Sequence, residues 1–215
     1  MLEKLHERLQ AHRPRKLSLA LPQAAVLVPI VARDEPTLLF TRRASHLNQH
    51  AGQVAFPGGK REPEDPDLLT TALREAQEEI ALTPSKVRLL GRLGDLISLH
   101  GIRVTPFVGV IPPDLPLRAD PGELDAIFEV PLAVFLEDRR SHTDVITAYG
   151  RPFYVPSYQA GEHVIWGLTA MMLVELMADG FGQSISLDTP PVDSHLNYRS
   201  RQRSPVPDTD FDRHS

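Results

Sequence analysis

The alternation of apolar and polar residues along the chain predicts a mixed α/β domain. Runs of apolar and β-branched residues predict strands, whereas apolar residues spaced three or four apart predict helices. The expected strands cover residues 24–32, 37–43, 87–93, 102–111, 126–130 and 151–156, and the expected helices cover residues 2–12, 68–82, 131–137 and 164–179. Strands, a helix, further strands and a second long helix follow in this order, which is typical of an α/β or α+β fold.

Breaks in this pattern divide the chain into three parts. Residues 1–20 form a helical extension, residues 21–187 form the main domain and residues 188–215 form a tail. The tail contains four prolines, several charged residues and almost no apolar ones, so we expect it to be disordered. Gly180 is expected to close the last helix, because glycine favours the C-terminal end of helices.

Composition and charge narrow the classes of function. Of the 215 residues, 23 are Lys or Arg and 28 are Asp or Glu, so the formal net charge is −5 and we expect no nucleic-acid partner. The chain has no cysteine, which excludes disulfides, thiolate catalysis and cysteine zinc sites and fits a cytoplasmic protein. The N-terminal residues show no signal peptide. No unbroken apolar stretch reaches the length of about 20 residues that spans a bilayer, so we expect no membrane partner.

Three glutamates on the helix predicted over residues 68–82 are the first candidates for chemistry. A helix turns by about 100° per residue, so Glu75, Glu78 and Glu79 share a face about 100° wide, while the apolar residues lie on a separate face. Neighbouring like charges destabilise a helix and favour a counter-charge, either Arg74 or a hard divalent cation such as Mg²⁺. The alternative is a solvated acidic face on a surface helix.

A glycine-containing loop precedes this helix and favours the functional interpretation. Phe56-Pro57-Gly58-Gly59 lies 14 residues before Arg74. Paired glycines allow the backbone to approach a ligand closely. A glycine loop followed by Arg-Glu-x-x-Glu-Glu is much rarer than either part alone.

Together these segments resemble the Nudix hydrolase family, whose box reads G-x5-E-x7-R-E-U-x-E-E-x-G-U, where U is a bulky apolar residue. Here the box begins at Gly59, and residues 74–82 read REAQEEIAL, so the Arg-Glu-x-x-Glu-Glu core is intact. Asp65 replaces the first glutamate, and one extra residue separates it from Arg74, which puts a ligand role for Asp65 in doubt. Ala76 and Ala81 replace the bulky residue and the late glycine, and we attribute both changes to packing.

The segment before the box resembles the signature of the coenzyme A pyrophosphatase branch, L-L-T-x-R-[SA]-x3-R-x3-G-x3-F-P-G-G. The matching residues are Leu39, Thr41, Arg43, Ala44, Gly52 and Phe56 to Gly59. Phe40 replaces the second leucine, and Asn48 replaces an arginine and so removes one phosphate contact. The resemblance extends over residues 24–180.

The resemblance implies a Nudix-like α/β/α sandwich with a mixed central sheet, and metal-dependent hydrolysis of a pyrophosphate. In this branch the substrate is coenzyme A (CoA) or a derivative, and the products are 4′-phosphopantetheine, or its acyl form, and adenosine 3′,5′-bisphosphate. It also implies Mg²⁺ or Mn²⁺ as the cofactor. The implied metal ligands are Glu75, Glu79 and Glu78, and Arg74 orients Glu78 or Glu79. The implied substrate contacts are Arg42, Arg43, His50, Gly58 and Gly59.

Several alternatives stay open. The general base is either Glu123, on a later loop, or Glu78. The substrate is either of the CoA type or another nucleoside diphosphate derivative, such as ADP-ribose or NADH. A Nudix module that binds a nucleotide without cleaving it is a further alternative, although such modules often lose box glutamates. A homodimer is one assembly compatible with the sequence.

Overall fold

The computed structural model describes residues 1–46, 51–148, 150–192 and 196–198. Its helices are α1 (Leu2–Ala11), α2 (Leu68–Ile80), α3 (Leu132–Leu136) and α4 (Gly167–Glu175), with a 3-10 turn at Pro84–Lys86 and a π-helical turn at Leu176–Phe181. Its strands are β1 (Gln23–Val31), β2 (Thr37–Arg43), β3 (Val54–Ala55), β4 (Gly58–Lys60), β5 (Arg88–Arg92), β6 (Leu96–Ile97), β7 (Arg103–Ile111), β8 (Leu124–Pro131), β9 (His142–Ala148), β10 (Arg151–Ala160), β11 (His163–Ile165) and β12 (Leu196–Tyr198).

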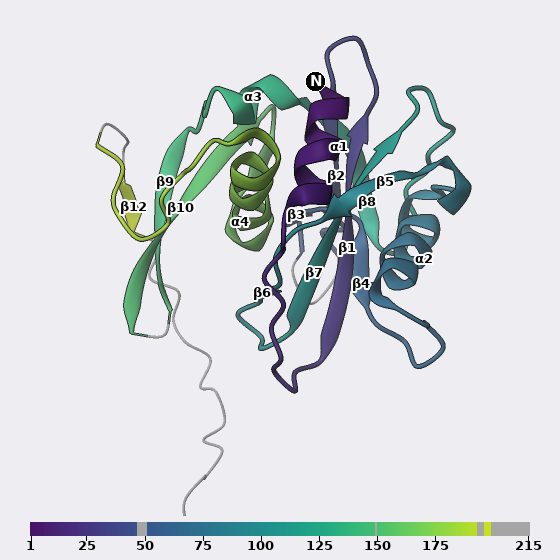
Figure 1. Cartoon of the computed structure of the whole chain (residues 1–215), viewed down its shortest axis with the longest axis horizontal. Helices are drawn as coiled ribbons and strands as arrows, with labels where there is room; N and C mark the ends of the chain where they lie inside the picture. Colours follow the sequence, from purple (N-terminus) through teal and green to yellow (C-terminus); the bar gives the residue numbers. More distant parts are fainter. Residues whose placement is uncertain (47–50, 149, 193–195, 199–215) are drawn as a thin grey trace, which may run out of the picture.

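The larger sheet is mixed and is built around β1. Strand β1 pairs in parallel with β7 along its whole length and antiparallel with β2 and β4, while β8 and β3 extend the sheet beyond β2. Most of β1 is buried on both faces, which explains its nearly continuous apolar sequence. In Figure 1 this sheet runs through the centre of the molecule. The expected mixed α+β fold with a mixed central sheet is therefore confirmed.

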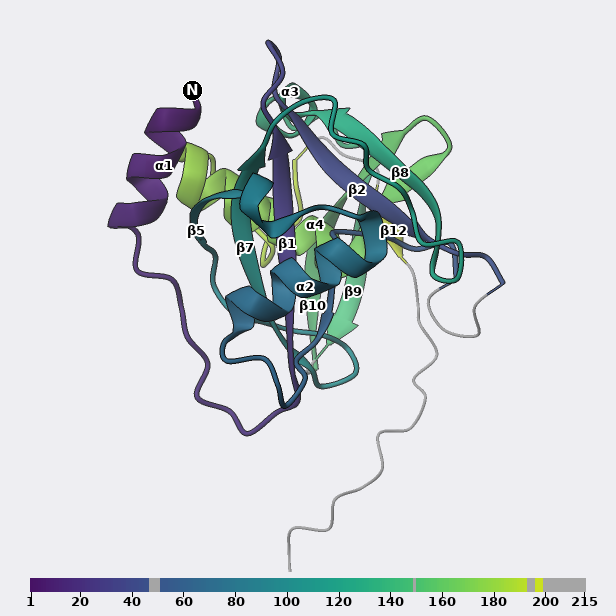
Figure 2. The same cartoon turned by 90° about the vertical axis from the view of Figure 1, so that its right-hand side faces the viewer.

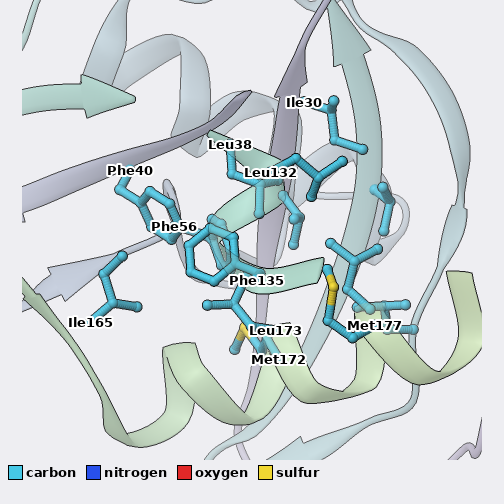
Figure 3. Packing of buried hydrophobic residues seen from close by; sticks show 14 of the residues in the cluster. Ile30, Leu38, Phe40, Phe56, Leu132, Phe135, Ile165, Met172, Leu173 and Met177 are labelled. Carbon is cyan, nitrogen blue, oxygen red and sulfur yellow. The ribbon is translucent and has the colours of Figure 1, made fainter. Parts of the chain in front are cut away.

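Helices cover both faces of this sheet. Helix α2 packs through Ala72, Ala76 and Ile80 against Leu27 and Leu39 on one face. Helices α4 and α1 cover the other face (Figures 1 and 2). The core on this second face is built around Phe40, Phe56, Phe135, Met172 and Leu173, and the rings of Phe40 and Phe56 stack with centroids 4.8 Å apart (Figure 3).

The N-terminal extension is part of the packed fold. Leu5 and Leu9 of α1 are buried in the same core as α4. Further along, the backbone N–H of Leu17 donates to the carboxylate of Asp95 at 2.9 Å. A side chain on Gly180 would lie 2.4 Å from the Leu5 side chain, so this glycine lets α1 approach the end of α4.

The C-terminal part contains a second sheet, of which the sequence pattern predicted only a strand over residues 151–156, now part of β10. Strand β10 pairs with β9 and β11, and β12 pairs in parallel with β9. Strand β12 falls in the segment expected to be a disordered tail, for which we had predicted no element. Residues 193–195 and 199–215 of that tail lie outside the described residues.

The start and end of the last helix differ from the prediction for residues 164–179. Val164 and Ile165 belong to β11, and α4 begins only at Gly167. The apolar run is continuous across this boundary, so spacing alone did not separate the strand from the helix. The left-handed residue that ends the helical segment is Gly182, not Gly180. No helix among the described residues is long and apolar enough to cross a membrane.

Glu175 is a buried carboxylate that should make stability depend on pH. Burial, opposed by the charge of Arg15 and aided by that of Asp179, raises its pKa from 4.5 to about 7. The fold therefore favours the protonated form, and it loses stability as the pH rises from about 4.5 to about 7, because the charged form is penalised. We expect Glu175→Gln to stabilise the protein at pH 8 and to have little effect at pH 4.5. Urea unfolding at both pH values measures this, and an equal effect at both would contradict it.

Candidate active site

Helix α2 carries the predicted carboxylates and is capped at both ends. Asp67 accepts a hydrogen bond from the Thr70 N–H at 2.8 Å, which fixes the first turn. At the other end Ala81 adopts the left-handed conformation with φ of 57°. The family's late glycine fits this conformation better than alanine does, so our attribution of Ala81 to packing was wrong. The backbone conformation explains the preference for glycine there.

The three glutamates of α2 differ in exposure. Glu79 is 5% exposed and Glu75 is half-buried, whereas the Glu78 side chain is 59% exposed. Glu79 and Glu75 therefore lie against the sheet side of the helix, toward the glycine loop. Glu78 lies toward solvent.

The glycine loop contacts both buried carboxylates. The Gly58 N–H donates a hydrogen bond to Glu79 Oε2 at 3.1 Å. A β-carbon on Gly59 would lie 2.4 Å from the Glu75 carboxyl carbon, so only glycine leaves room for this carboxylate. Both glycines are held in β4, which pairs with β1 through Ala25↔Gly59 and Val26↔Gly58. The sheet thus fixes the loop against the helix.

Arg74 holds the outer side of the site together. Its Nε and Nη2 donate to the two carboxylate oxygens of Asp65 at 3.1 Å each, and Nη2 also donates to the Lys60 carbonyl at 3.1 Å. Its Nη1 lies 3.1 Å from Glu75 Oε1 and 2.9 Å from Glu78 Oε2. Arg74 therefore contacts two of the three glutamates and fixes α2 to the loop.

Asp65 holds Arg74 in place. It is buried, and it accepts further hydrogen bonds from the Glu62 N–H at 3.0 Å and the Thr71 hydroxyl at 2.9 Å. The hydrogen bonds from Arg74, above all, hold the pKa of Asp65 well below its usual range. With its oxygens engaged in this way, Asp65 acts as an anchor for Arg74.

The buried carboxylates have raised pKa values. Burial raises the pKa of Glu79 to about 7, the Gly58 N–H opposes this shift, and the charges of Glu75 and Glu123 add to it. Burial also raises the pKa of Glu75, although Arg74 opposes the shift. A cation bound at these oxygens would favour the charged form of both carboxylates and so oppose these shifts.

Glu123 lies close enough to act on both carboxylates, since its charge raises the pKa of Glu75 and of Glu79. Its loop is fixed at two points. The Asp120 N–H donates to the Glu79 carbonyl at 2.8 Å, and the Glu123 carbonyl accepts from the Ala44 N–H at 2.8 Å. The structure therefore brings Glu123, predicted from the sequence as a candidate base, to the face of α2 that carries Glu75 and Glu79.

The two predicted phosphate-binding arginines lie in different surroundings. The buried Nε of each has no hydrogen-bond partner among the described residues, but only Arg43 has a positive charge that acts on Glu79. Arg42 Nη1 instead pairs with Glu162 Oε1 at 3.2 Å. Arg43 therefore faces the carboxylate site, and Arg42 faces the β10–β11 hairpin. His50 lies outside the described residues.

The carboxylates fit a hard divalent cation in donor type and charge. Glu75 and Glu79 supply oxygen ligands, which Mg²⁺ and Mn²⁺ prefer, and their mutual repulsion would be relieved by a cation. Across the ranges that the structure describes, no three His, Asp or Glu side chains are already gathered in a metal-binding geometry. Assignment of Glu75, Glu78 and Glu79 as ligands therefore stays a prediction.

Some residues around the site were missed by sequence reasoning. Asp65 was considered only as a doubtful ligand, and a bidentate arginine partner nine residues away has no local sequence signal. Trp166 lines two cavities beside Arg43 and Arg42. Its place next to Gly167, at the start of α4, becomes apparent only once the helix boundary is known.

Comparisons with known proteins agree on the family. A model described as the NUDIX domain matches residues 21–148. The "Uncharacterized Nudix hydrolase NudL" of Photorhabdus laumondii is 46% identical over 163 residues, which cover 76% of this chain and 87% of that protein. The protein of the same name in Shigella sonnei is 46% identical over 178 residues, covering 82% and 93%. Among solved structures, a C. elegans Ap4A hydrolase in a binary complex matches with a TM-score of 0.45 and 18% identity, covering 54% of this chain and 82% of that one.

Proposed function

The chain belongs to the Nudix hydrolase family, and from this premise we propose that it hydrolyses the pyrophosphate bond of CoA or a CoA derivative. The products are 4′-phosphopantetheine, or its acyl form, and adenosine 3′,5′-bisphosphate. Pyrophosphate hydrolysis is general to the family; the CoA-type substrate is the proposal. The absence of cysteine supports action in the cytoplasm.

The main observation in support of the proposal is that two sequence motifs contact each other in the folded structure. The CoA-type signature covers β2 and the glycine loop, and the hydrolase box covers α2. Gly58, at the end of the signature, donates to Glu79 of the box, and Arg43 of the signature acts on the same carboxylate. The residues typical of CoA pyrophosphatases therefore meet the residues typical of pyrophosphate hydrolysis.

This arrangement assigns roles to the chain's own residues. Arg43 binds a phosphate oxygen, because its charge acts at the carboxylate site and the guanidinium geometry suits that contact. Glu75 and Glu79 hold a divalent cation, which neutralises charge on the pyrophosphate when bound. Gly58 orients Glu79, and Arg74 orients Glu75 and Glu78.

The reaction needs a base. The oxygen of a water molecule forms a bond to one phosphorus, and the bond from that phosphorus to the bridging oxygen breaks. The attacking water loses a proton to a carboxylate. Glu123 is suited to this role because it is exposed and next to the buried pair, whereas Glu78 accepts a hydrogen bond from Arg74.

Substitution of Glu123 tests the assignment of the base. We expect Glu123→Gln to lower kcat by about 10²–10³-fold with little change in KM, as for loss of a general base. Glu78→Gln, prepared in parallel, should have a smaller effect, because Glu78 is largely exposed and paired with Arg74. A near-normal kcat for Glu123→Gln would show that Glu123 is not the general base and would leave Glu78 as the candidate. The measurement is the dependence of kcat on pH for both variants.

A substrate panel tests the proposed function itself. The purified protein is incubated with CoA, ADP-ribose, NADH and dGTP, each with Mg²⁺, Mn²⁺ or EDTA, and the products are separated by liquid chromatography. We expect metal-dependent release of adenosine 3′,5′-bisphosphate from CoA. Cleavage of another compound in its place would retain the family chemistry and reject the CoA assignment. Binding without cleavage of any compound would favour a nucleotide-binding module.

A further inference from the structure

An apolar cavity of about 310 Å³ lies beside the carboxylate site. Its walls come from β3, the β6–β7 turn, the β9–β10 hairpin and the start of α4. The main apolar side chains are Ile97, Leu99, Ile146, Phe153, Leu168 and Met171. The volume is within the range of small-molecule sites.

The walls of this apolar cavity offer hydrocarbon surface. Ile146 and Phe153 face each other as a cross-strand pair of β9 and β10. The hydroxyl of Thr169, on the α4 wall, donates a hydrogen bond to the Val54 carbonyl at 3.0 Å. Polar side chains, including Gln53, Ser98 and His100, occupy only a minor part of the lining. A sugar or a second nucleotide, with many hydroxyl or charged groups, is therefore a poor fit for this space.

Arg43 connects the apolar cavity to the carboxylates. It lines the cavity, and its charge acts on Glu79. The next residue, Ala44, donates its N–H to the carbonyl of Glu123 at 2.8 Å. A phosphate held by Arg43 would thus have the hydrolytic residues on one side and the apolar cavity on the other.

Several cavity walls lie C-terminal to residue 148, where the match to the family model ends. Phe153, Leu168 and Met171 belong to β10 and α4, which follow that segment. The carboxylates, the glycine loop and Arg43 all lie within it. The residues assigned to hydrolysis therefore lie within the matched segment, whereas the apolar cavity also needs elements that follow it.

We propose that the apolar cavity binds the aliphatic arm that a CoA-type substrate carries beyond its pyrophosphate, so that β9, β10 and α4 select the substrate. The arm begins with a methylene group that carries the phosphate, followed by a dimethyl-substituted carbon, and this apolar start suits the space beside Arg43. This inference rests on the proposed function for the identity of the substrate. The adenosine half lies outside the cavity.

The test uses two variants and one matched control in the full-length protein. Leu99→Glu places a charge at the cavity mouth, where the leucine is 57% exposed and the fold should tolerate the change. Ile146→Trp fills the cavity from a half-buried wall position. Leu89→Glu changes another exposed leucine, which lies on β5 away from the cavity. KM and kcat are measured for CoA and for ADP-ribose, and binding of 4′-phosphopantetheine and adenosine 3′,5′-bisphosphate is measured by calorimetry.

We expect Leu99→Glu and Ile146→Trp to weaken 4′-phosphopantetheine binding and to raise the KM for CoA by about tenfold or more, as for loss of one apolar side-chain contact. Binding of adenosine 3′,5′-bisphosphate should stay unchanged, and Leu89→Glu should match the wild type. Unchanged 4′-phosphopantetheine binding in Leu99→Glu would overturn the inference, as would an equal loss for both half-substrates. If CoA is not hydrolysed, the proposed function fails, and the calorimetry still decides whether the cavity binds the arm.

Discussion

The variant Glu79→Gln is expected to lose about a thousandfold or more in kcat and, in the metal-free protein, to gain stability above pH 7. The loss follows because Glu79 is the most buried of the three glutamates of α2 and is held by the Gly58 N–H, so no other side chain takes its place as a cation ligand. The gain follows from the pKa of about 7 that burial gives this carboxyl, against an ordinary value of 4.5. Glutamine keeps an oxygen for Gly58 and removes the charge that the fold penalises.

The sign of the pH effect distinguishes this variant from a general loss of folding. A raised pKa means that the native state binds the proton more tightly than the unfolded chain, so the wild type loses stability as the pH rises from about 4.5 to about 7. The stability difference between Glu79→Gln and the wild type should therefore grow across this range and vanish below it. Thermal unfolding in EDTA at pH 4.5 and 8 tests the predicted gain in stability, and kcat measured in Mg²⁺ tests the predicted loss of activity.

Glu64→Gln provides the control for this experiment. Glu64 is an exposed carboxylate of the loop that leads to α2, so it shares the chemistry and the neighbourhood of Glu79 but not its burial. It should keep wild-type activity and stability at both pH values. If Glu79→Gln retained kcat within about threefold of the wild type, Glu79 would not be an essential ligand, and the assignment of the site would have to move to Glu75 and Glu78.

The helix with the carboxylates was predictable because its signals are local. Residues 68–82 combine apolar spacing near 3.6 with Asp67 as a capping residue directly before them, and the helix is observed over Leu68–Ile80. The face shared by the three glutamates follows from helix geometry alone. Which of them is buried does not, because burial is decided by the glycine loop and β1, which lie far from α2 in the sequence.

The parts that escaped prediction depend on distant pairing. Strand β12 exists through its pairing with β9, about fifty residues earlier, and its sequence gives no alternating pattern. Val164 and Ile165 were assigned to a helix because an apolar run alone does not distinguish a buried strand from a helix. The apolar cavity is formed by segments spread between residues 43 and 171, so no local motif predicts it.

Replacing Gly59 with alanine should separate the chemistry of the site from the stability of the fold. The new β-carbon would lie 2.4 Å from the Glu75 carboxyl carbon and 2.5 Å from both of its oxygens. Because these atoms end a flexible side chain, the carboxylate can move away without disturbing β4. We expect kcat at low Mg²⁺ to fall by about a hundredfold, since small displacements of catalytic groups have effects of this size, while the unfolding free energy changes by less than about 1 kcal/mol.

Substitution of the neighbouring Gly58 should affect folding, whereas substitution of Gly59 should affect activity, so the two variants are compared. A β-carbon there would lie 2.4 Å from the Ala25 carbonyl oxygen and 2.5 Å from the Val26 α-carbon, and φ is 157°, so the backbone of β1 blocks any side chain. Gly58→Ala should therefore fail to fold or unfold at a much lower temperature. Thermal unfolding and a Mg²⁺ titration of activity compare the two variants. Wild-type activity of Gly59→Ala at low Mg²⁺ would show that the position of the Glu75 carboxylate is unimportant, which would remove Glu75 from the set of cation ligands.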